Sequence, residues 1–108
     1  MRAKVLVADD DGDVRFMTAF TLRQLGGYNV IEARNGQEAW ELACMHQPNI
    51  LVLDVQMPQM TGYDVCRRIR ADATLSATPI ILLSAKGQAA EIEEGREAGA
   101  TQYMLKPY

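Results

Sequence analysis

The stretch "ILVLDVQMPQMTG", residues 50–62, carries an apolar run directly into the carboxylate of Asp54. Such a short, uninterrupted apolar run is typical of a strand buried on both faces, as in a parallel sheet that helices cover on both sides. A carboxylate is rarely buried unless another group compensates its charge. The stretch therefore predicts a buried strand, and next to Asp54 a place where the fold gathers other charges.

Similar apolar runs alternate with helical patterns along the rest of the chain. Strands are expected over 3–8, 28–33, 49–54, 79–85 and 101–106, and helices over 13–25, 36–46, 62–71 and 89–99. Five strands with helices between them predict an α/β fold, an open doubly wound five-stranded parallel sheet with helices on both faces. The three-and-four spacing of a helix predicts these inward residues: Val14, Met17, Thr21 and Leu25 in the first helix, and Val65, Cys66 and Ile69 in the third.

The bulk composition fits one globular domain, residues 1–108. It is 48% hydrophobic and 23% charged, and the net charge of −3 argues against direct binding of nucleic acid. We expect no membrane span and no signal peptide, and the two cysteines, Cys44 and Cys66, lack the spacing of a metal site. A reduced, cytoplasmic protein is therefore expected. Three basic residues are expected to form the solvated face of a helix: Arg67, Arg68 and Arg70.

Chemistry-bearing residues follow four of the predicted strands. In such sheets functional groups gather at the carboxyl ends of the strands. The residues there are Asp9, Asp10 and Asp11 after the first strand, Asp54 at the end of the third, Ser84 at the end of the fourth, and Lys106 at the end of the fifth. Neighbouring carboxylates repel one another unless their pKa values rise or a cation joins them. Magnesium suits this set, because it binds one or two carboxylates together with a phosphate oxygen.

A phosphoryl group would complete this arrangement. Lys106 and the Ser84 hydroxyl could hold its oxygens, and Asp54 could act as the nucleophile that forms an acyl phosphate. Each residue alone also has a structural interpretation, since Asp11 or Asp13 could cap a helix and Lys106 could simply pair with an acid. Only their joint position on one edge favours the phosphoryl site.

Five segments closely resemble the receiver domain of bacterial two-component response regulators. They are "VADDD" (7–11), "ARNGQEA" (33–39), "LVLDVQMPQMTG" (51–62), "PIILLSA" (79–85) and "GREAGATQYMLKPY" (95–108). The resemblance covers the whole chain and implies a flavodoxin-like sheet with the strand order 2-1-3-4-5, which is carried over from the family.

We call the residues at this edge of the sheet the rim: Asp9, Asp10, Asp54, Ser84 and Lys106. The resemblance also implies a role for each of them. Asp54 is expected to be the phosphoacceptor. The expected ligands of Mg²⁺, with Mn²⁺ as an alternative, are Asp10, Asp54 and the backbone carbonyl of Gln56, with Asp9 acting through water. Ser84 and Tyr103 are expected to form the switch, and Lys106 to bind a phosphoryl oxygen.

Positions beside the site are expected to tune it. In the family, residues at Gln56 and Lys86 vary and set how fast the acyl phosphate hydrolyses, while a small residue at Ala85 leaves the site open. A cis peptide bond is expected between Lys106 and Pro107.

These roles imply a phosphorylation-dependent signalling switch and not a metabolic enzyme. A partner histidine kinase or phosphotransfer protein would supply the phosphoryl group, and the chain would later remove it by autodephosphorylation. Ser84 and Tyr103 would change the surface of the fourth helix and fifth strand, where another receiver or an output domain would bind.

The chain departs from the family pattern after its fifth strand. A receiver normally carries a fifth helix there, and the sequence stops at Tyr108. We expect part of one sheet face, with Phe16 and Phe20 beside it, to be bare. A shortened chain, or coverage by a neighbouring chain, would account for this.

Three other functions are weighed against the switch. A phosphorylation-independent receiver-like interaction module fits the fold but leaves the full set of rim residues without a purpose. A flavin-binding protein would need a phosphate-cradling loop where this chain has three aspartates. An aspartyl phosphatase would use Asp9 and Asp11, which leaves Asp54 and Lys106 unexplained.

Overall fold

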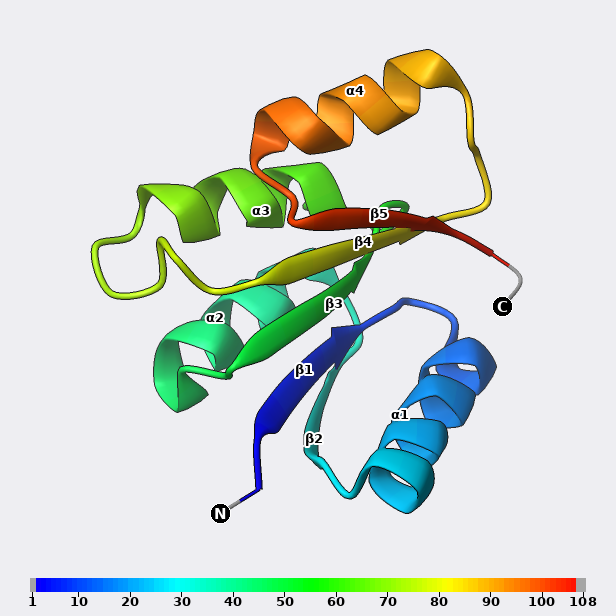
Figure 1. The fold of residues 1–108 in the computed structure, drawn as a ribbon, viewed down its shortest axis with the longest axis vertical. Helices are drawn as coiled ribbons and strands as arrows, with labels where there is room; N and C mark the ends of the chain where they lie inside the picture. The colour runs from blue at the N-terminus through cyan, green and yellow to red at the C-terminus, as the bar shows by residue number, and fades with distance from the viewer. Residues whose placement is uncertain (1, 107–108) are drawn as a thin grey trace.

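The computed structural model describes residues 2–106 and contains the expected alternation of strands and helices (Figure 1). The strands are β1 (Lys4–Ala8), β2 (Asn29–Ala33), β3 (Ile50–Asp54), β4 (Ile80–Ser84) and β5 (Gln102–Leu105). The helices are α1 (Gly12–Gly26), α2 (Gly36–His46), α3 (Gly62–Ala71) and α4 (Ala89–Ala98). All strands pair in parallel, in the order β2-β1-β3-β4-β5. The predicted doubly wound sheet and its strand order are confirmed.

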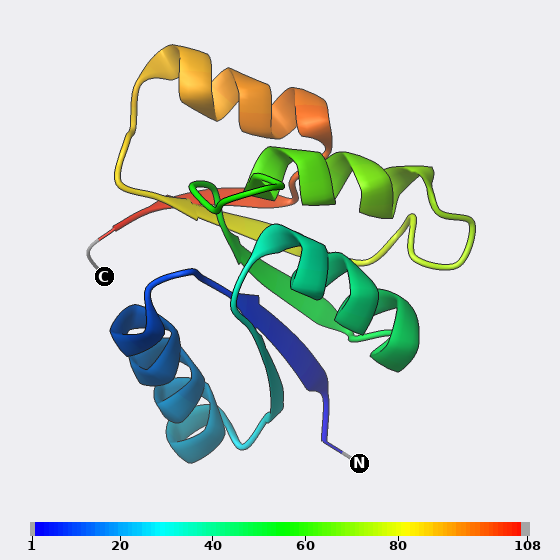
Figure 2. The same cartoon turned by 180° about the vertical axis from the view of Figure 1, so that it is seen from behind.

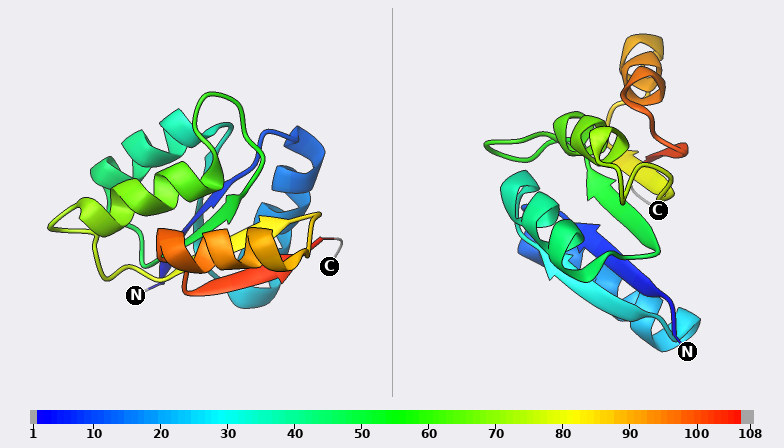
Figure 3. Two further views of the ribbon diagram at one scale, coloured as in Figure 1. Left: turned by 90° about the horizontal axis from the view of Figure 1, so that it is seen from above. Right: turned by 90° about the vertical axis from the view of Figure 1, so that its left-hand side faces the viewer.

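The helices form two layers of unequal size. Helix α1 lies alone on one face, over β1 and β2, whereas α2 and α3 cover the opposite face and α4 continues their layer beside β5 (Figures 2 and 3). The larger core lies under this second layer and includes Leu6, Leu51 and Leu82, which are fully buried. From α3, Val65, Cys66 and Ile69 are fully buried, as the helical spacing predicts.

Helix α1 presents a different side to the sheet from the one predicted. Ala19 is fully buried and Leu22 packs beside it against Val5 and Val7. The predicted inward stripe is mostly exposed: Val14 is half-buried, Thr21 is exposed, Met17 is 60% exposed and Leu25 is 85% exposed. A small alanine lets the helix approach β1 closely, so the helix rests on Ala19 and turns the larger apolar residues aside.

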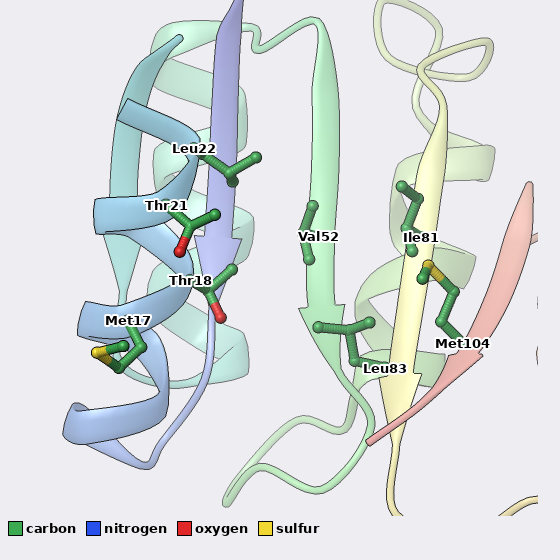
Figure 4. A pocket seen from close by; sticks show the side chains of 8 residues that line it. All are labelled: Met17, Thr18, Thr21, Leu22, Val52, Ile81, Leu83 and Met104. Atoms are coloured by element: carbon green, nitrogen blue, oxygen red, sulfur yellow. The ribbon is translucent and has the colours of Figure 1, made fainter. Parts of the chain in front are cut away.

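The turned-aside residues border an apolar groove of about 370 Å³. Its walls are Met17, Thr18, Thr21 and Leu22 of α1 and, across the sheet, Val52, Ile81, Leu83 and Met104 (Figure 4). Phe16 and Phe20 stack on the outside of α1, with ring centroids 6.0 Å apart, and are 57% and 48% exposed. Within residues 2–106, β5 is the last element and no helix covers this half of the face, as expected.

Glycine at position 36 allows α2 to touch the loop after β3. A Cβ atom there would collide with the backbone carbonyl of Met60, in the loop that joins β3 to α3. We expect Gly36→Ala to lower the free energy of unfolding by about 2 kcal/mol, because one of the two backbones must move. Urea unfolding measures this. Gly12→Ala is the matched control, since its Cβ would meet only Arg15, at an ordinary 3.7 Å. Equal stability of the two variants would contradict the prediction.

Candidate functional site

The ends of four parallel strands bring the predicted site residues together. Asp9 directly follows β1, Asp54 and Ser84 are the last residues of β3 and β4, and Lys106 directly follows β5. The Lys106 amine lies 2.9 Å from Asp54 Oδ1 and 3.1 Å from Asp9 Oδ2. A lysine 52 residues beyond Asp54 in the sequence thus bridges two carboxylates on different strands. Asp9, Asp54 and Lys106 therefore lie close together at the carboxyl edge of the sheet, as the sequence predicts.

Three carboxylates form a cluster that suits a hard divalent cation. Asp9, Asp10 and Asp54 each place one oxygen so that all three lie within 4.8 Å of one another. Asp9 and Asp54 are buried, at 3% and 6% exposure, whereas Asp10 is exposed. Carboxylate oxygens open to water on one side are the donors that Mg²⁺ prefers, because this ion keeps part of its hydration shell. The residues present therefore fit magnesium, and also the closely similar Mn²⁺.

Burial changes the pKa values of the charged groups in the cluster. Burial raises the pKa of Asp54, and the neighbouring Asp9 and Asp10 carboxylates raise this pKa further, whereas the hydrogen bond from Lys106 lowers it. Burial disfavours the charged form of Lys106, but its hydrogen bonds to Asp54 and Asp9 raise its pKa above the usual value. Lys106 is therefore a fixed positive charge at neutral pH, and it does not fully compensate the buried acids. A further cation would relieve this excess of negative charge.

The two neighbouring aspartates Asp9 and Asp10 differ in their protein partners. Asp9 Oδ1 accepts a hydrogen bond from the Asp11 backbone N–H at 3.0 Å, and Asp9 Oδ2 accepts one from Lys106. Arg15 donates to the Asp9 backbone carbonyl at 2.9 Å and so fixes the main chain at this point. Asp10 is exposed. Asp10 is therefore the more accessible of the two for a direct metal bond.

Asp11 has the structural role that the sequence left open. Its Oδ1 accepts hydrogen bonds from the backbone N–H groups of Asp13 and Val14, so it is the N-cap of α1. Asp13 is an acidic residue in the first helical turn. Such caps stabilise a helix because they satisfy N–H groups that have no partner within the helix.

Ser84 and Tyr103 meet through the backbone of Lys86. Ser84 is 3% exposed, and its Oγ accepts a hydrogen bond from the Lys86 N–H at 3.0 Å. The Tyr103 hydroxyl donates to the Lys86 carbonyl at 2.9 Å. The side chain of Tyr103 is half-buried, against the larger core. The two predicted switch residues thus share one peptide segment between β4 and α4.

The predicted flanking residues stand at the open side of the site. Gln56, Ala85 and Lys86 are all exposed, two residues after Asp54 and one and two residues after Ser84. Gly62 explains the close fit behind Asp54, because a Cβ there would lie 2.5 Å from the Asp54 carbonyl oxygen. The predicted cis bond involves Pro107, which lies outside the described residues.

One residue of the predicted basic cluster is not a solvated side chain. Arg67 and Arg68 are exposed, but Arg70 is half-buried and clamps the loops beside α3. It donates to the carbonyls of Ser76, Thr78 and Gly99 and to the Thr101 hydroxyl. The sequence pattern gave no sign of this, because the acceptors are mostly backbone atoms.

The raised pKa of Asp54 predicts a measurable effect of pH on stability. A carboxyl whose pKa is higher in the folded state favours folding while protonated, and this advantage disappears as pH rises through the folded pKa. In metal-free solution, Asp54→Asn should therefore gain on the parent chain as pH rises above about 4, the ordinary range of an aspartate. We expect it to be about 1 kcal/mol more stable at neutral pH.

Urea unfolding with a chelator, between pH 4 and pH 7, measures this difference. Adding magnesium should reverse the order, because an ion held by the three-carboxylate cluster would stabilise the folded parent more than the variant. A metal-free Asn variant that is less stable than the parent at pH 7 would contradict the prediction. It would mean that the ion pair with Lys106 outweighs burial.

Among residues 2–106, the structure contains no helix of the length and apolar character needed to cross a membrane.

Known proteins resemble the chain in both sequence and fold. Chemotaxis protein CheY1 of Helicobacter pylori is 37% identical over 106 residues, which is 97% of this chain and 86% of that protein. Transcriptional regulatory protein PdtaR of Mycobacterium tuberculosis is 40% identical over 105 residues, and the chain spans only 50% of its length. For the relative named "Probable transcriptional regulator ycf27" of Guillardia theta, at 39% identity, the chain spans 41%.

A solved structure also has the same fold as this chain. The structure of chemotaxis protein CheY4 of Vibrio cholerae superposes on this chain with a TM-score of 0.94 at 35% identity, over 100% of this chain and 89% of that one. The sequence model of the response regulator receiver domain matches residues 5–108, nearly the whole chain. With the acidic rim and the 2-1-3-4-5 sheet described above, these matches show that the chain belongs to the response regulator receiver domain family.

Proposed function

We propose that the chain is a phosphorylation-dependent signalling switch in which Asp54 accepts a phosphoryl group. The observation that carries the proposal is the Lys106 amine, held 2.9 Å from Asp54 at the edge of a three-carboxylate cluster. A carboxylate cluster that fits a cation, an ammonium group beside one carboxylate and a buried hydroxyl at the end of the neighbouring strand are what phosphoryl transfer needs, since catalysis there is mainly positioning and charge neutralisation.

Each residue has a distinct part in the transfer. An Asp54 oxygen attacks the phosphorus, a new P–O bond forms, and the bond from phosphorus to the donor breaks with its electron pair leaving on the donor. A partner histidine kinase or phosphotransfer protein would provide that donor. Lys106 then holds a phosphoryl oxygen, and the Ser84 hydroxyl donates to another.

The metal ligands of the proposal are those that the family resemblance implies, and three of the four residues belong to the carboxylate cluster. Asp10, Asp54 and the backbone carbonyl of Gln56 would bind Mg²⁺ or Mn²⁺ directly, and Asp9, whose oxygens already accept hydrogen bonds, would act through water. When bound, the ion supplies positive charge next to the transferring group.

Two further steps of the switch would involve exposed residues: hydrolysis of the acyl phosphate, and binding of a partner to the changed surface. The exposed Gln56 and Lys86 would set how fast water attacks the acyl phosphate, and the small Ala85 would leave room for the donor. Ser84 and Tyr103 would alter the surface of α4 and β5, where a second receiver or an output domain would bind, in the cytoplasm. Relatives are named as chemotaxis and as transcriptional proteins, so the likeness supports the switch and no particular output.

The test is intact-mass analysis after incubation with acetyl phosphate and magnesium. We expect a gain of one phosphoryl group, absent from Asp54→Asn and from a metal-free sample. The gain should be lost in mild alkali or hydroxylamine, as acyl phosphates are. A folded parent chain that binds magnesium and gains no mass would overturn the proposal and favour the phosphorylation-independent interaction module.

A further inference from the structure

An arginine near the start of α1 links the main chain of the rim to β2. Arg15 is the fourth residue of α1, and its side chain is 17% exposed. Its Nη1 donates to the Asp9 carbonyl at 2.9 Å, and its Nε donates to Glu32 Oε1, on β2, at 3.3 Å. The proposed phosphoryl transfer gives neither Arg15 nor Glu32 a part, so the purpose of this pair of contacts is open.

Arg15 lies where the helix itself disfavours a cation. The N-terminus of a helix carries a partial positive charge, which favours acids such as Asp13 in the first turn and opposes an arginine there. The hydrogen bonds of the guanidinium group therefore have to offset this repulsion. Departures from such local preferences are expected mainly at functional sites. The contact that connects Arg15 to the site is the one with the Asp9 carbonyl.

The Asp9 carbonyl belongs to the peptide unit between two carboxylates of the cluster. This unit is planar and ends at the Cα atoms of Asp9 and Asp10, so its orientation sets the direction in which both side chains leave the main chain. Other hydrogen bonds hold the ends of the turn: the Asp9 N–H donates to the Ala33 carbonyl at 3.1 Å, and the Asp11 N–H donates to Asp9 Oδ1. The bond from Arg15 fixes the plane of the peptide unit itself.

Glu32 anchors this arginine to the sheet. Its Oε1 pairs with Arg15 at 3.3 Å, and its Oε2 pairs with Arg23 at 3.1 Å. Glu32 lies opposite Val7 in the parallel register of β1 and β2, so the guanidinium of Arg15 is held by a strand as well as by its own helix. Arg23 makes the same two kinds of contact, but its carbonyl partner is Val30, toward the amino end of β2 and away from the rim.

We propose that Arg15, anchored by Glu32, is a positioning residue of the metal site, which orients the Asp9–Asp10 peptide so that both carboxylates serve one divalent cation, directly or through water. The inference deepens the proposed function and rests on it for the use of the cation. The sign of the effect separates positioning from charge. By charge alone, removing a positive group beside three carboxylates should strengthen magnesium binding, whereas loss of positioning should weaken it.

Titration calorimetry of the unphosphorylated chain with magnesium alone tests the proposal. Arg15→Met keeps an apolar stem and removes the two hydrogen bonds, and we expect magnesium to bind about tenfold more weakly, the cost typical of losing a group that orients a ligand. Arg23→Met is the matched control, because it also removes one positive charge, one ion pair with Glu32 and one hydrogen bond to a carbonyl. Its affinity should stay within about twofold of the parent, since a distant charge is screened.

Amide hydrogen exchange of the metal-free chain, followed by nuclear magnetic resonance, measures the turn directly. The Asp9 and Asp11 N–H groups should exchange about tenfold faster in Arg15→Met, because the peptide between them is no longer held. Their exchange in Arg23→Met should equal that of the parent. Magnesium affinity in Arg15→Met that is unchanged or higher, or equal exchange of these two amides in both variants, would overturn the inference.

A charge-conserving variant keeps the test decisive if Arg15→Met does not fold. Arg15→Lys retains the positive charge, but one ammonium group cannot reproduce the two fixed directions in which the guanidinium donates. We expect it to bind magnesium at least about threefold more weakly than the parent. Affinity equal to the parent's would mean that the charge at this position is sufficient, and the positioning role would be rejected.

The rate of mass gain with acetyl phosphate separates this inference from the proposed function. In Arg15→Met, the magnesium concentration that gives half the maximal rate should rise about tenfold. The rate at saturating magnesium should stay within about twofold of the parent, because the contacts of Arg15 are with Asp9 and Glu32. If the parent binds magnesium and gains no phosphoryl group, the proposed function fails, and the magnesium affinities of the variants still decide the role of Arg15. A parent that binds no magnesium would overturn the inference.

Discussion

Replacing Lys106 by methionine should slow the gain of a phosphoryl group by about 100-fold or more, because one fixed charge that stabilises the transferring group is lost. Methionine keeps much of the length and apolar stem of lysine but cannot donate a hydrogen bond. The amine is 2.9 Å from Asp54 Oδ1, so its loss would act directly at the proposed phosphoacceptor. The rate of mass gain with acetyl phosphate and saturating magnesium measures the effect.

The same substitution should have opposite effects on folding and on metal binding. Asp9 and Asp54 are both buried and share this amine, so in metal-free solution Lys106→Met should lower the free energy of unfolding by about 2 kcal/mol. Magnesium affinity should rise, since no ammonium group competes for the carboxylates. High magnesium should therefore restore the stability of the variant and leave its phosphorylation slow.

Lys4→Met is the matched control for this pair of effects. It also removes one positive charge, but the Lys4 amine donates to the His46 carbonyl, away from the rim. We expect its phosphorylation rate to stay within about twofold of the parent, because a distant charge is screened at ordinary salt. Equal rates in the Lys106 and Lys4 variants would show that the ion pair at the rim has no part in the transfer.

Local patterns in the sequence were sufficient for the strands, the helices and the parallel sheet, whereas the strand order came from the family resemblance. Apolar runs mark buried strands, and in a parallel sheet every strand ends on the same edge, so Asp54, Ser84 and Lys106 had to lie close together. The orientation of α1 was not predictable in the same way. Periodicity identifies an apolar stripe, but which side meets the sheet depends on how closely the helix approaches it, and here Ala19 decides that.

Contacts between distant residues and backbone atoms were also beyond the sequence. Tyr63 and Arg70 were not recognised as more than ordinary helix residues, because their partners are carbonyls that any residue could supply. The carbonyls of Glu91 and Gly99, which accept from Tyr63 and Arg70, come close only once α4 is in place. The sequence left open that Lys106 simply pairs with an acid, and the structure shows such ion pairs with two acids, Asp9 and Asp54.

Asp10→Asn should weaken magnesium binding by about 100-fold or more, whereas Asp9→Asn should weaken it by only about tenfold, the smaller cost typical of a residue that acts through water or another ligand. Asp10 is exposed and belongs to the three-carboxylate cluster. Both oxygens of Asp9 already accept hydrogen bonds, from the Asp11 N–H and from Lys106. A direct metal bond at Asp9 would have to displace one of these donors.

Titration calorimetry with magnesium, repeated with manganese, measures both affinities. Asp13→Asn is the control, because it removes a nearby charge from the first turn of α1 without touching the cluster. If Asp9→Asn proves the more damaging change, Asp9 binds the ion directly and gives up its hydrogen bond from Lys106 or from the Asp11 N–H. Loss of the bond from Lys106 would free this amine to turn to a phosphoryl group only in the metal-loaded chain.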